Sequence, residues 1–294
     1  MRKKKKGNTY LRFLSGWKEF VSQAEKIKLG HEDGSYHGMK CSSVLSSSSF
    51  AGTDTLAEAI RLAWEGWPDG REKFRDLRKE VNADRLFSRS QQTRREFGKC
   101  GDHPDIQRYL RGDPDHMVTI KNEVLQEPGK VIQIGIQRSV LAGVSQEEIM
   151  RKGVATLLVY QLLSDLGYGV QIDMILSSSS SPKGSADVRM ERYIPLTQAS
   201  KPVDIDTLAF MLAHPAAFRR IGIAVRETEP TRIRKEMGAY KSGNYGQSDA
   251  PQFLSGYDLF IGRDEQELAT AEDVVQYVIE LLKEAGVQTP NSLK

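Results

Sequence analysis

Short polar segments follow two of the apolar runs in the C-terminal half of the chain. One comes directly after the run 131–136, and the other after the run 257–262. In an open parallel sheet, ligands bind in the crevice at the carboxyl ends of the strands. These segments therefore predict a ligand-binding edge. Its candidate residues are Gln137, Arg138, Ser139 and Asp264.

Ser139 and Asp264 are also the groups at this edge that a hydrolase would use. A serine nucleophile needs a neighbouring base, and α/β-hydrolases carry it in a Gly-x-Ser-x-Gly turn. The sequence contains no such turn. A loop hydroxyl that caps the following helix is the alternative role for Ser139, so a hydrolase is kept only as an alternative function.

Basic residues are concentrated in the first part of the chain. Residues 1–112 contain 23 Lys and Arg against 15 Asp and Glu, a balance of +8, whereas the remainder has a balance of −5. Such clusters supply phosphate contacts in nucleic-acid-binding proteins. The candidates are Lys3, Lys4, Lys5, Lys6, Arg94 and Arg95. The alternative is an ordinary solvated surface, because acidic residues alternate with the basic ones over 71–85.

Cysteine and histidine side chains are the natural ligands for zinc. Cys100 and His103 have the spacing of a zinc knuckle, and Cys41 follows His31 and His37 in a serine-rich region. Zinc motifs usually contain two regularly spaced pairs of ligands. The alternative interpretation is therefore that these are unrelated loop residues and that one cysteine is a buried free thiol. No Gly-Lys-Ser/Thr loop follows a predicted strand. We therefore expect no metal and no cofactor.

The elements that position these residues follow an α/β pattern from residue 117 onward. Ser145 and Glu148 form a capping box for a helix over 149–166, and Gly167 ends it. A helix that is apolar on most of its circumference, between two strands, indicates a parallel sheet covered on its faces. We predict an α/β fold with three layers and a mainly parallel, Rossmann-like sheet. The predicted strands are 117–122, 131–136, 169–176, 188–196 and 257–262, with the first two forming a hairpin.

The front half is predicted to be helical. Apolar residues recur three to four positions apart from Tyr10 to Ile27, which is typical of an amphipathic helix. Further helices are expected over 55–65 and 71–85. The predicted organisation is a basic N-terminal helix with a serine-rich linker (1–49), a charged helical region that packs on the core (50–115) and an α/β domain (116–294).

The order of strand, polar loop, long helix, glycine and strand resembles the von Willebrand factor A fold. That fold carries a metal-binding Asp-x-Ser-x-Ser loop after its strand, and this chain has Gln137-x-Ser139-x-Leu141 at the same place. The leading carboxylate and the last hydroxyl are missing, and hard divalent cations prefer charged oxygen ligands. The resemblance therefore implies a degenerate metal site on a binding scaffold.

Four further phrases resemble an uncharacterised family of phage and prophage proteins. They cover residues 49–53, 65–70, 104–114 and 149–155, and their Gly-Trp-Pro and Gly-Asp-Pro turns are the most specific parts. The resemblance implies a viral or mobile-element origin, with the host cytoplasm or a virion as the location, and brings no established activity. We expect these turns to hold the helical front half against the α/β core.

Composition narrows the function classes. Of the 294 residues, 39% are apolar and 28% charged, which is enough for a sizeable core. Two cysteines exclude a disulfide scaffold and fit a reducing cytoplasm. No window holds 18 apolar residues, so no membrane span is expected. We predict a non-enzymatic binding or assembly protein with a protein partner, and a nucleic-acid-binding accessory protein is the alternative.

Overall fold

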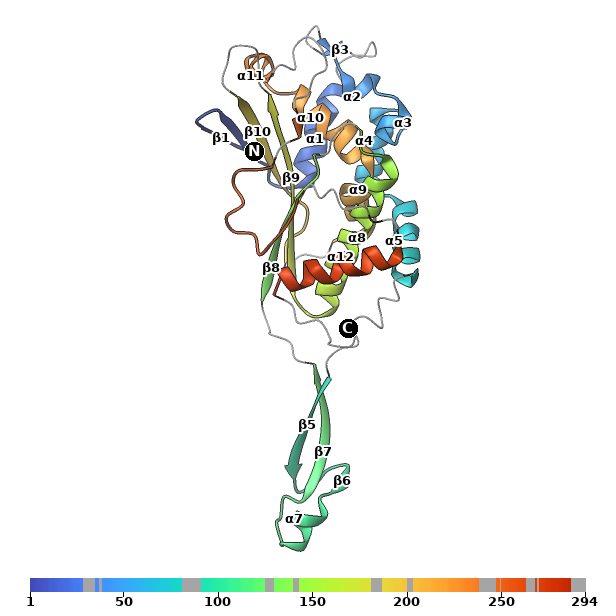
Figure 1. Ribbon diagram of the computed structural model, residues 1–294, viewed down its shortest axis with the longest axis vertical. Helices are drawn as coiled ribbons and strands as arrows, with labels where there is room; N and C mark the ends of the chain where they lie inside the picture. Colours follow the sequence, from blue (N-terminus) through green and yellow to red (C-terminus); the bar gives the residue numbers. More distant parts are fainter. Residues whose placement is uncertain are drawn as a thin grey trace.

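A mixed β-sheet organises the body of the protein (Figure 1), with strands in the order β1-β2-β10-β9-β8-β12 and β11 added beside β9. Three of the five pairings along this order are parallel, so the sheet is mainly parallel as predicted, but mixed. Its strands are β1 (Arg2–Lys6), β2 (Thr9–Phe13), β8 (Val131–Gln137), β9 (Gly169–Ser180), β10 (Val188–Pro195), β11 (Gln247–Ser248) and β12 (Leu259–Ile261). The computed structural model describes residues 1–28, 35–36, 39–80, 91–124, 130–139, 143–180, 187–199, 203–237, 247–248, 250–262, 268 and 270–286.

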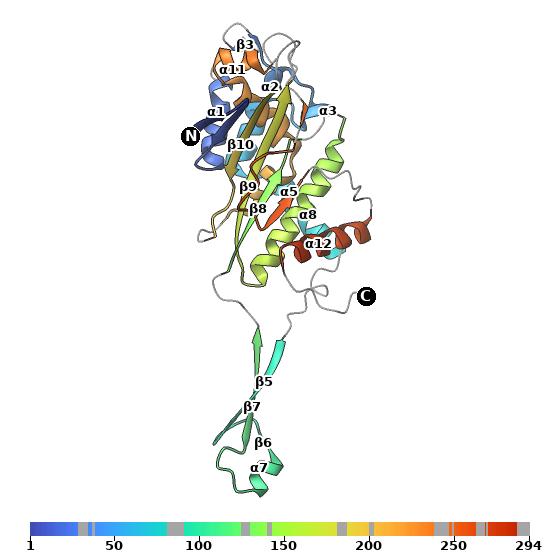
Figure 2. The same cartoon turned by 60° about the vertical axis from the view of Figure 1, so that its left-hand side comes forward.

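The helices of the body pack against one face of this sheet (Figure 2). On that face, alternate residues of β8, namely Ile132, Ile134 and Ile136, are buried in the main apolar core. The helices are α1 (Trp17–Lys28), α2 (Ser42–Leu45), α3 (Ser48–Ala51), α4 (Leu56–Glu65), α5 (Pro68–Glu80), α8 (Gln146–Asp165), α9 (Ile205–Ala213), η1 (Ala217–Gly222), α10 (Ile223–Glu227), α11 (Thr231–Glu236) and α12 (Ala271–Glu284).

The opposite face of the sheet carries no layer of described helices, so the predicted three-layer arrangement is wrong. A second apolar cluster of Leu11, Ile175 and Tyr193 is covered there by Phe253, Leu254, Tyr257 and Phe260. Tyr257 also donates a hydrogen bond across this face to Asp173 Oδ2, at 2.9 Å. Because β9 and β10 are antiparallel neighbours, their connection needs no crossover helix to cover the second face.

The predicted strand-helix-strand unit is confirmed. The helix expected over 149–166 is α8, and the Ser145 side chain accepts from the backbone N–H of Glu148 at its start. Gly167 has a φ of 88°, the left-handed conformation expected just after a helix. The helix joins β8 and β9, which are parallel neighbours. Local signals were sufficient here because the caps and the apolar residues lie within one contiguous segment.

The chain begins with a β-hairpin, whereas the sequence predicted a helix from Tyr10. Strands β1 and β2 pair antiparallel, β2 pairs parallel with β10, and the helix α1 starts only at Trp17. Tyr10 faces the helical layer beside Met190, while Phe13 faces the other side and stacks on Tyr193. Both faces of β2 are therefore buried, and that double burial imitates helical spacing. The three predicted domain boundaries stay a prediction.

A separate three-stranded sheet forms an arm that extends away from the body in both views (Figures 1 and 2). The arm consists of β5 (Gln91–Gly98), β6 (His103–Pro104), α7 (Ile106–Leu110) and β7 (Met117–Val124). The prediction that 117–122 forms a hairpin with 131–136 is wrong, since β7 pairs with β5 along its whole length. Both sides of β8 are already occupied, by β9 and β12.

None of the described helices is by itself long and apolar enough to cross a membrane. One bent pair, Ile205–Ala213 with Ala217–Glu227, passes that test jointly by length and composition.

Candidate functional site

The sheet brings three of the predicted edge residues together at the carboxyl end of β8. Ser139 Oγ accepts hydrogen bonds from the backbone N–H of Ser177, at 3.1 Å, and from Gln137 Nε2, at 3.3 Å. Ser139 is buried, so its hydroxyl joins the ends of β8 and β9 and gives no support to a nucleophilic role. The fourth predicted residue, Asp264, lies outside the described residues.

Arg138 is the unusual member of this group. Its side chain is only 7% exposed and lines a cavity of about 40 Å³ that also contacts Lys152 and Tyr277. Burial, together with the nearby charge of Arg219, lowers the pKa of Arg138 to about 10. No hydrogen-bond acceptor for its guanidinium is found among the described residues. The edge that the sequence predicted therefore contains a buried cation beside a small cavity.

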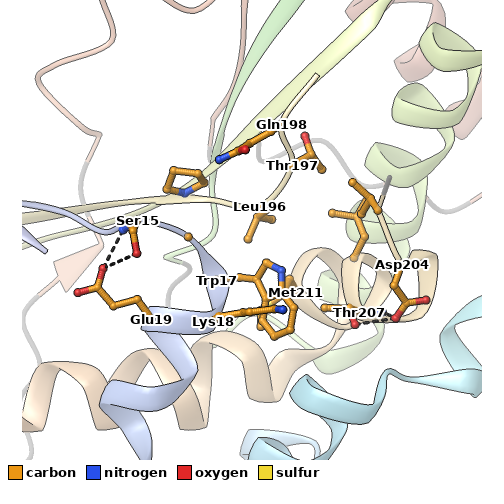
Figure 3. A pocket seen from close by; sticks show the side chains of 14 residues that line it. Ser15, Trp17, Lys18, Glu19, Leu196, Thr197, Gln198, Asp204, Thr207 and Met211 are labelled. Carbon is orange, nitrogen blue, oxygen red and sulfur yellow. Dashed lines mark hydrogen bonds between the residues drawn. The ribbon is translucent and has the colours of Figure 1, made fainter. Parts of the chain in front are cut away.

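A much larger cavity, of about 510 Å³, lies at the other end of the sheet (Figure 3). The strands β2 and β10 run opposite to β9, so their carboxyl ends lie away from those of β8 and β9. Trp17 at the start of α1, Leu196 after β10 and Met211 of α9 form its apolar wall. We call this cavity the Trp17 pocket.

The polar side chains around the Trp17 pocket are mostly held by the protein itself. Glu19 accepts from the backbone and hydroxyl of Ser15 and from the terminal amine; although burial raises the pKa of Glu19, these bonds lower it overall. Asp204 accepts from Thr207 at the start of α9. Thr197 Oγ1 is bonded to the backbone of β9. What the pocket offers to an occupant is therefore mainly apolar surface.

The sequence did not predict this pocket. The prediction of a single helix over residues 10–27 left no strand β2 in the sheet. The sheet edge formed by the carboxyl ends of β2 and β10 was therefore not predicted. The signal that points to it is the end of the strand predicted over 188–196, because the residues that follow that strand line the pocket.

The end of the arm exposes a set of large apolar side chains. Ile106, Tyr109 and Leu110 of α7 are 69%, 62% and 78% exposed. Asp105 caps α7 by accepting from the backbone N–H of Arg108. We call the face formed by Ile106, Tyr109 and Leu110 the arm tip. The predicted role of the Gly-Asp-Pro turn (112–114), holding the N-terminal half against the core, is wrong because this turn lies on the arm. The Gly-Trp-Pro turn (66–68) does pack on the core, since the Trp67 N–H donates to the carbonyl of Asp206 at 3.2 Å and the Trp67 side chain is buried in the main core.

Comparison with known proteins identifies the family. A sequence profile described as "Domain of unknown function (DUF7192)" matches residues 2–292. The chain belongs to this family. No curated protein and no solved structure matches it. The DUF7192 match includes the body and the arm alike, so both are parts of one family domain.

The two basic candidate groups of this DUF7192 chain occupy different regions. Lys3, Lys4, Lys5 and Lys6 are exposed on the edge strand β1, where Lys5 Nζ donates to Tyr10 Oη at 3.1 Å. Arg94 and Arg95 lie on β5 of the arm, opposite Lys121 and Ile120. The structure therefore does not bring the two groups together. Lysines on an edge strand also discourage pairing with other strands.

The candidate zinc ligands of the DUF7192 chain are also separated. Cys41 is buried in the main core of the body, whereas Cys100 is exposed and, like His103, belongs to the arm. His31 and His37 lie outside the described residues. Within the described part of the chain, no three His, Cys, Asp or Glu residues are arranged to hold a metal ion.

Proposed function

We propose that this protein is a non-enzymatic assembly protein that binds other copies of itself through the arm tip. The observation that carries the proposal is the exposure of Ile106, Tyr109 and Leu110 at the end of the projecting arm. They occupy positions i, i+3 and i+4, the spacing by which helical segments anchor in apolar grooves. Contiguous apolar side chains displayed in this way mark interaction sites.

The occupant of the tip is the Trp17 pocket of a second copy. Its volume of about 510 Å³ is in the range of pockets that enclose whole small molecules, so the side chains of Tyr109 and Leu110 fit within it. Its wall is apolar, as the tip requires. Arg111 is exposed at the end of α7, and Asp204 is exposed at the pocket, so opposite charges meet across the contact.

This contact joins two different surfaces, so it is heterologous and generates rings or open filaments. The arm extends away from the body in both views, and α7 at its end lies apart from α1, whose first residues line the Trp17 pocket (Figures 1 and 2). A chain of contacts from copy to copy follows from that separation.

Sedimentation velocity over a range of protein concentrations tests the proposal. The wild-type protein should form larger species as concentration rises. Val203 also lines the Trp17 pocket. The tip variant Tyr109→Ser/Leu110→Ser and the pocket variant Val203→Arg should each be monomeric. An equimolar mixture of the two variants should form a 1:1 dimer, because the mixture contains one intact tip and one intact pocket.

Leu45→Ser is the matched control, since Leu45 is 57% exposed but lies on the body away from the tip. It should assemble like the wild type. A wild-type protein that stays monomeric at every concentration overturns the proposal. Assembly by the pocket variant at wild-type strength overturns it as well, because the tips would then be pairing with each other.

Nucleic-acid binding through β1 is the second candidate function. It is favoured by the exposure of the four lysines on one edge strand of the body. Phosphate contacts from such a strand would be independent of base sequence and sensitive to salt.

We also propose a phage or prophage origin, because four segments of the sequence (49–53, 65–70, 104–114 and 149–155) resemble such proteins. We propose a cytoplasmic location because the chain has only two cysteines. A likeness to the von Willebrand factor A fold is proposed for the unit β8–α8–β9 alone, since the helices of the body cover one face of the sheet. Fractionation of host cells that express the protein tests the location.

A further inference from the structure

We propose that the cavity beside Arg138 binds a small oxyanion, namely the phosphate or carboxylate group of a ligand. The site lies at the carboxyl ends of β8 and β12 and at the start of α8. It is separate from the arm tip and from the Trp17 pocket, so it does not depend on the assembly proposal.

The first argument is the buried charge. Arg138 is 7% exposed, and its guanidinium finds no acceptor among the described residues, while its side chain lines the cavity. A buried cation without a carboxylate or an anion is destabilising, because the lost hydration is not replaced. A bound oxyanion supplies the missing acceptor, and guanidinium groups bind such anions through two parallel hydrogen bonds.

The second argument is the positive potential around the cavity. Arg219 is near enough to lower the pKa of Arg138, and Lys152 lines the cavity. The one carboxylate in the lining belongs to Glu148, and it forms an ion pair with Lys152 at 3.4 Å. The 20-residue helix α8 starts at this place, and the positive end of its dipole also favours an anion.

The third argument is size. A cavity of about 40 Å³ exceeds the roughly 10–15 Å³ that one water needs, but it is far below the volume of pockets that enclose a drug-sized molecule. The space therefore suits a single small group. Gln137 and Tyr277, which also line the cavity, add polar side chains for its oxygens.

Isothermal titration of the full-length protein with inorganic phosphate and, separately, with acetate tests this inference. We expect saturable binding of at least one of the two, weakened by about tenfold or more in Arg138→Met. Arg138→Lys should recover part of the affinity. The exposed Arg75→Met is the matched control and should bind like the wild type. Tighter binding of phosphate than of acetate identifies a phosphate ligand, and the reverse order a carboxylate ligand.

Thermal unfolding gives a second measurement that does not require tight binding. Without the oxyanion, Arg138→Met should melt at a higher temperature than the wild type, since the variant contains no unpaired buried cation. With the oxyanion at a saturating concentration and matched ionic strength, this order should reverse. If Arg138→Met melts at a lower temperature in both buffers, and neither anion binds to the wild type, Arg138 has a purely structural role and the inference is overturned.

Discussion

Arg12 and Glu229 form a bidentate, buried ion pair although they are 217 residues apart in the sequence. Arg12 Nε and Nη2 donate to the two carboxylate oxygens of Glu229 at 2.9 and 3.0 Å, and both side chains are buried. Arg192 Nη2 donates to the same carboxylate at 3.2 Å. One carboxylate therefore joins the parallel strands β2 and β10 to the segment between α10 and α11.

Replacing Glu229 with Gln should be among the most destabilising single changes in the protein. The substitution leaves two buried guanidinium groups without a countercharge, and breaking a buried pair in this way costs about 3–5 kcal/mol. Urea unfolding followed by circular dichroism measures the loss. Glu65→Gln is the control, because the Arg61–Glu65 pair is more than half exposed and should contribute under about 1 kcal/mol. Equal losses in both variants would contradict the prediction.

The same carboxylate makes stability depend on acid pH. Although burial raises the pKa of Glu229, the charges of Arg192 and Arg12 lower it overall. Its contribution is therefore complete above the pKa of an unfolded glutamate and is lost as the pH falls through the lower pKa of the folded state. The free energy of unfolding of Glu229→Gln should fall less steeply with decreasing pH than that of the wild type.

The burial of His214 should make the stability of the fold depend on pH in a second range, which lies above that of Glu229. It is buried between Trp67 and Phe210, and burial lowers its pKa from 6.5 to about 4. The unfolded chain therefore binds a proton that the folded chain does not, and stability falls as the pH decreases from about 6.5 to 4, by about 3 kcal/mol. His214→Phe should flatten this part of the profile, whereas His103→Asn, at an exposed site, should leave it unchanged. A wild-type slope in His214→Phe would refute the assignment.

Gly153 allows α8 and α9 to cross closely. A Cβ at this position would lie 2.2 Å from both Ala213 Cα and the Leu212 carbonyl oxygen, which are backbone atoms and cannot move aside cheaply. Gly153→Ala should lower the free energy of unfolding by about 1–3 kcal/mol, even though alanine is the better helix former. Gly143→Ala, where a Cβ meets no atom within 4 Å, should change it by under about 0.5 kcal/mol.

Substitution of Lys4 distinguishes two roles for the lysines of β1, namely binding of nucleic acid and prevention of pairing between this edge strand and other strands. If β1 contacts phosphates, Lys4→Gln should weaken binding to a DNA duplex and reduce the slope of log K against log salt by about 1. Lys283→Gln, an exposed change on α12, is the control and should have no effect. Filter binding at several salt concentrations measures both quantities. Unchanged affinity and slope in Lys4→Gln would leave edge protection as the role of these lysines.

Features that depend on interactions close in sequence were predicted correctly, whereas features that depend on contacts between distant segments were not. The helix α8 was predicted together with its N-cap Ser145 and the glycine that follows it, Gly167. These signals lie at the two ends of the helix that they delimit, so no contact with a distant segment was needed. The partner of β7 was wrong, because pairing with β5 or with β8 satisfies the same local alternation. Spacing likewise cannot distinguish a helix from a strand that is buried on both faces, and β2 is such a strand.

The sequence by itself determined the α/β class and the strand end at which Arg138 lies. These depend on periodicity, caps and residue types, which are local properties. Only the tertiary structure decided that Arg138 is buried beside a cavity, that β2 and β10 create the Trp17 pocket and that the arm displays Tyr109. Burial and strand pairing depend on contacts between segments far apart in the chain, and several such pairings are compatible with one local pattern.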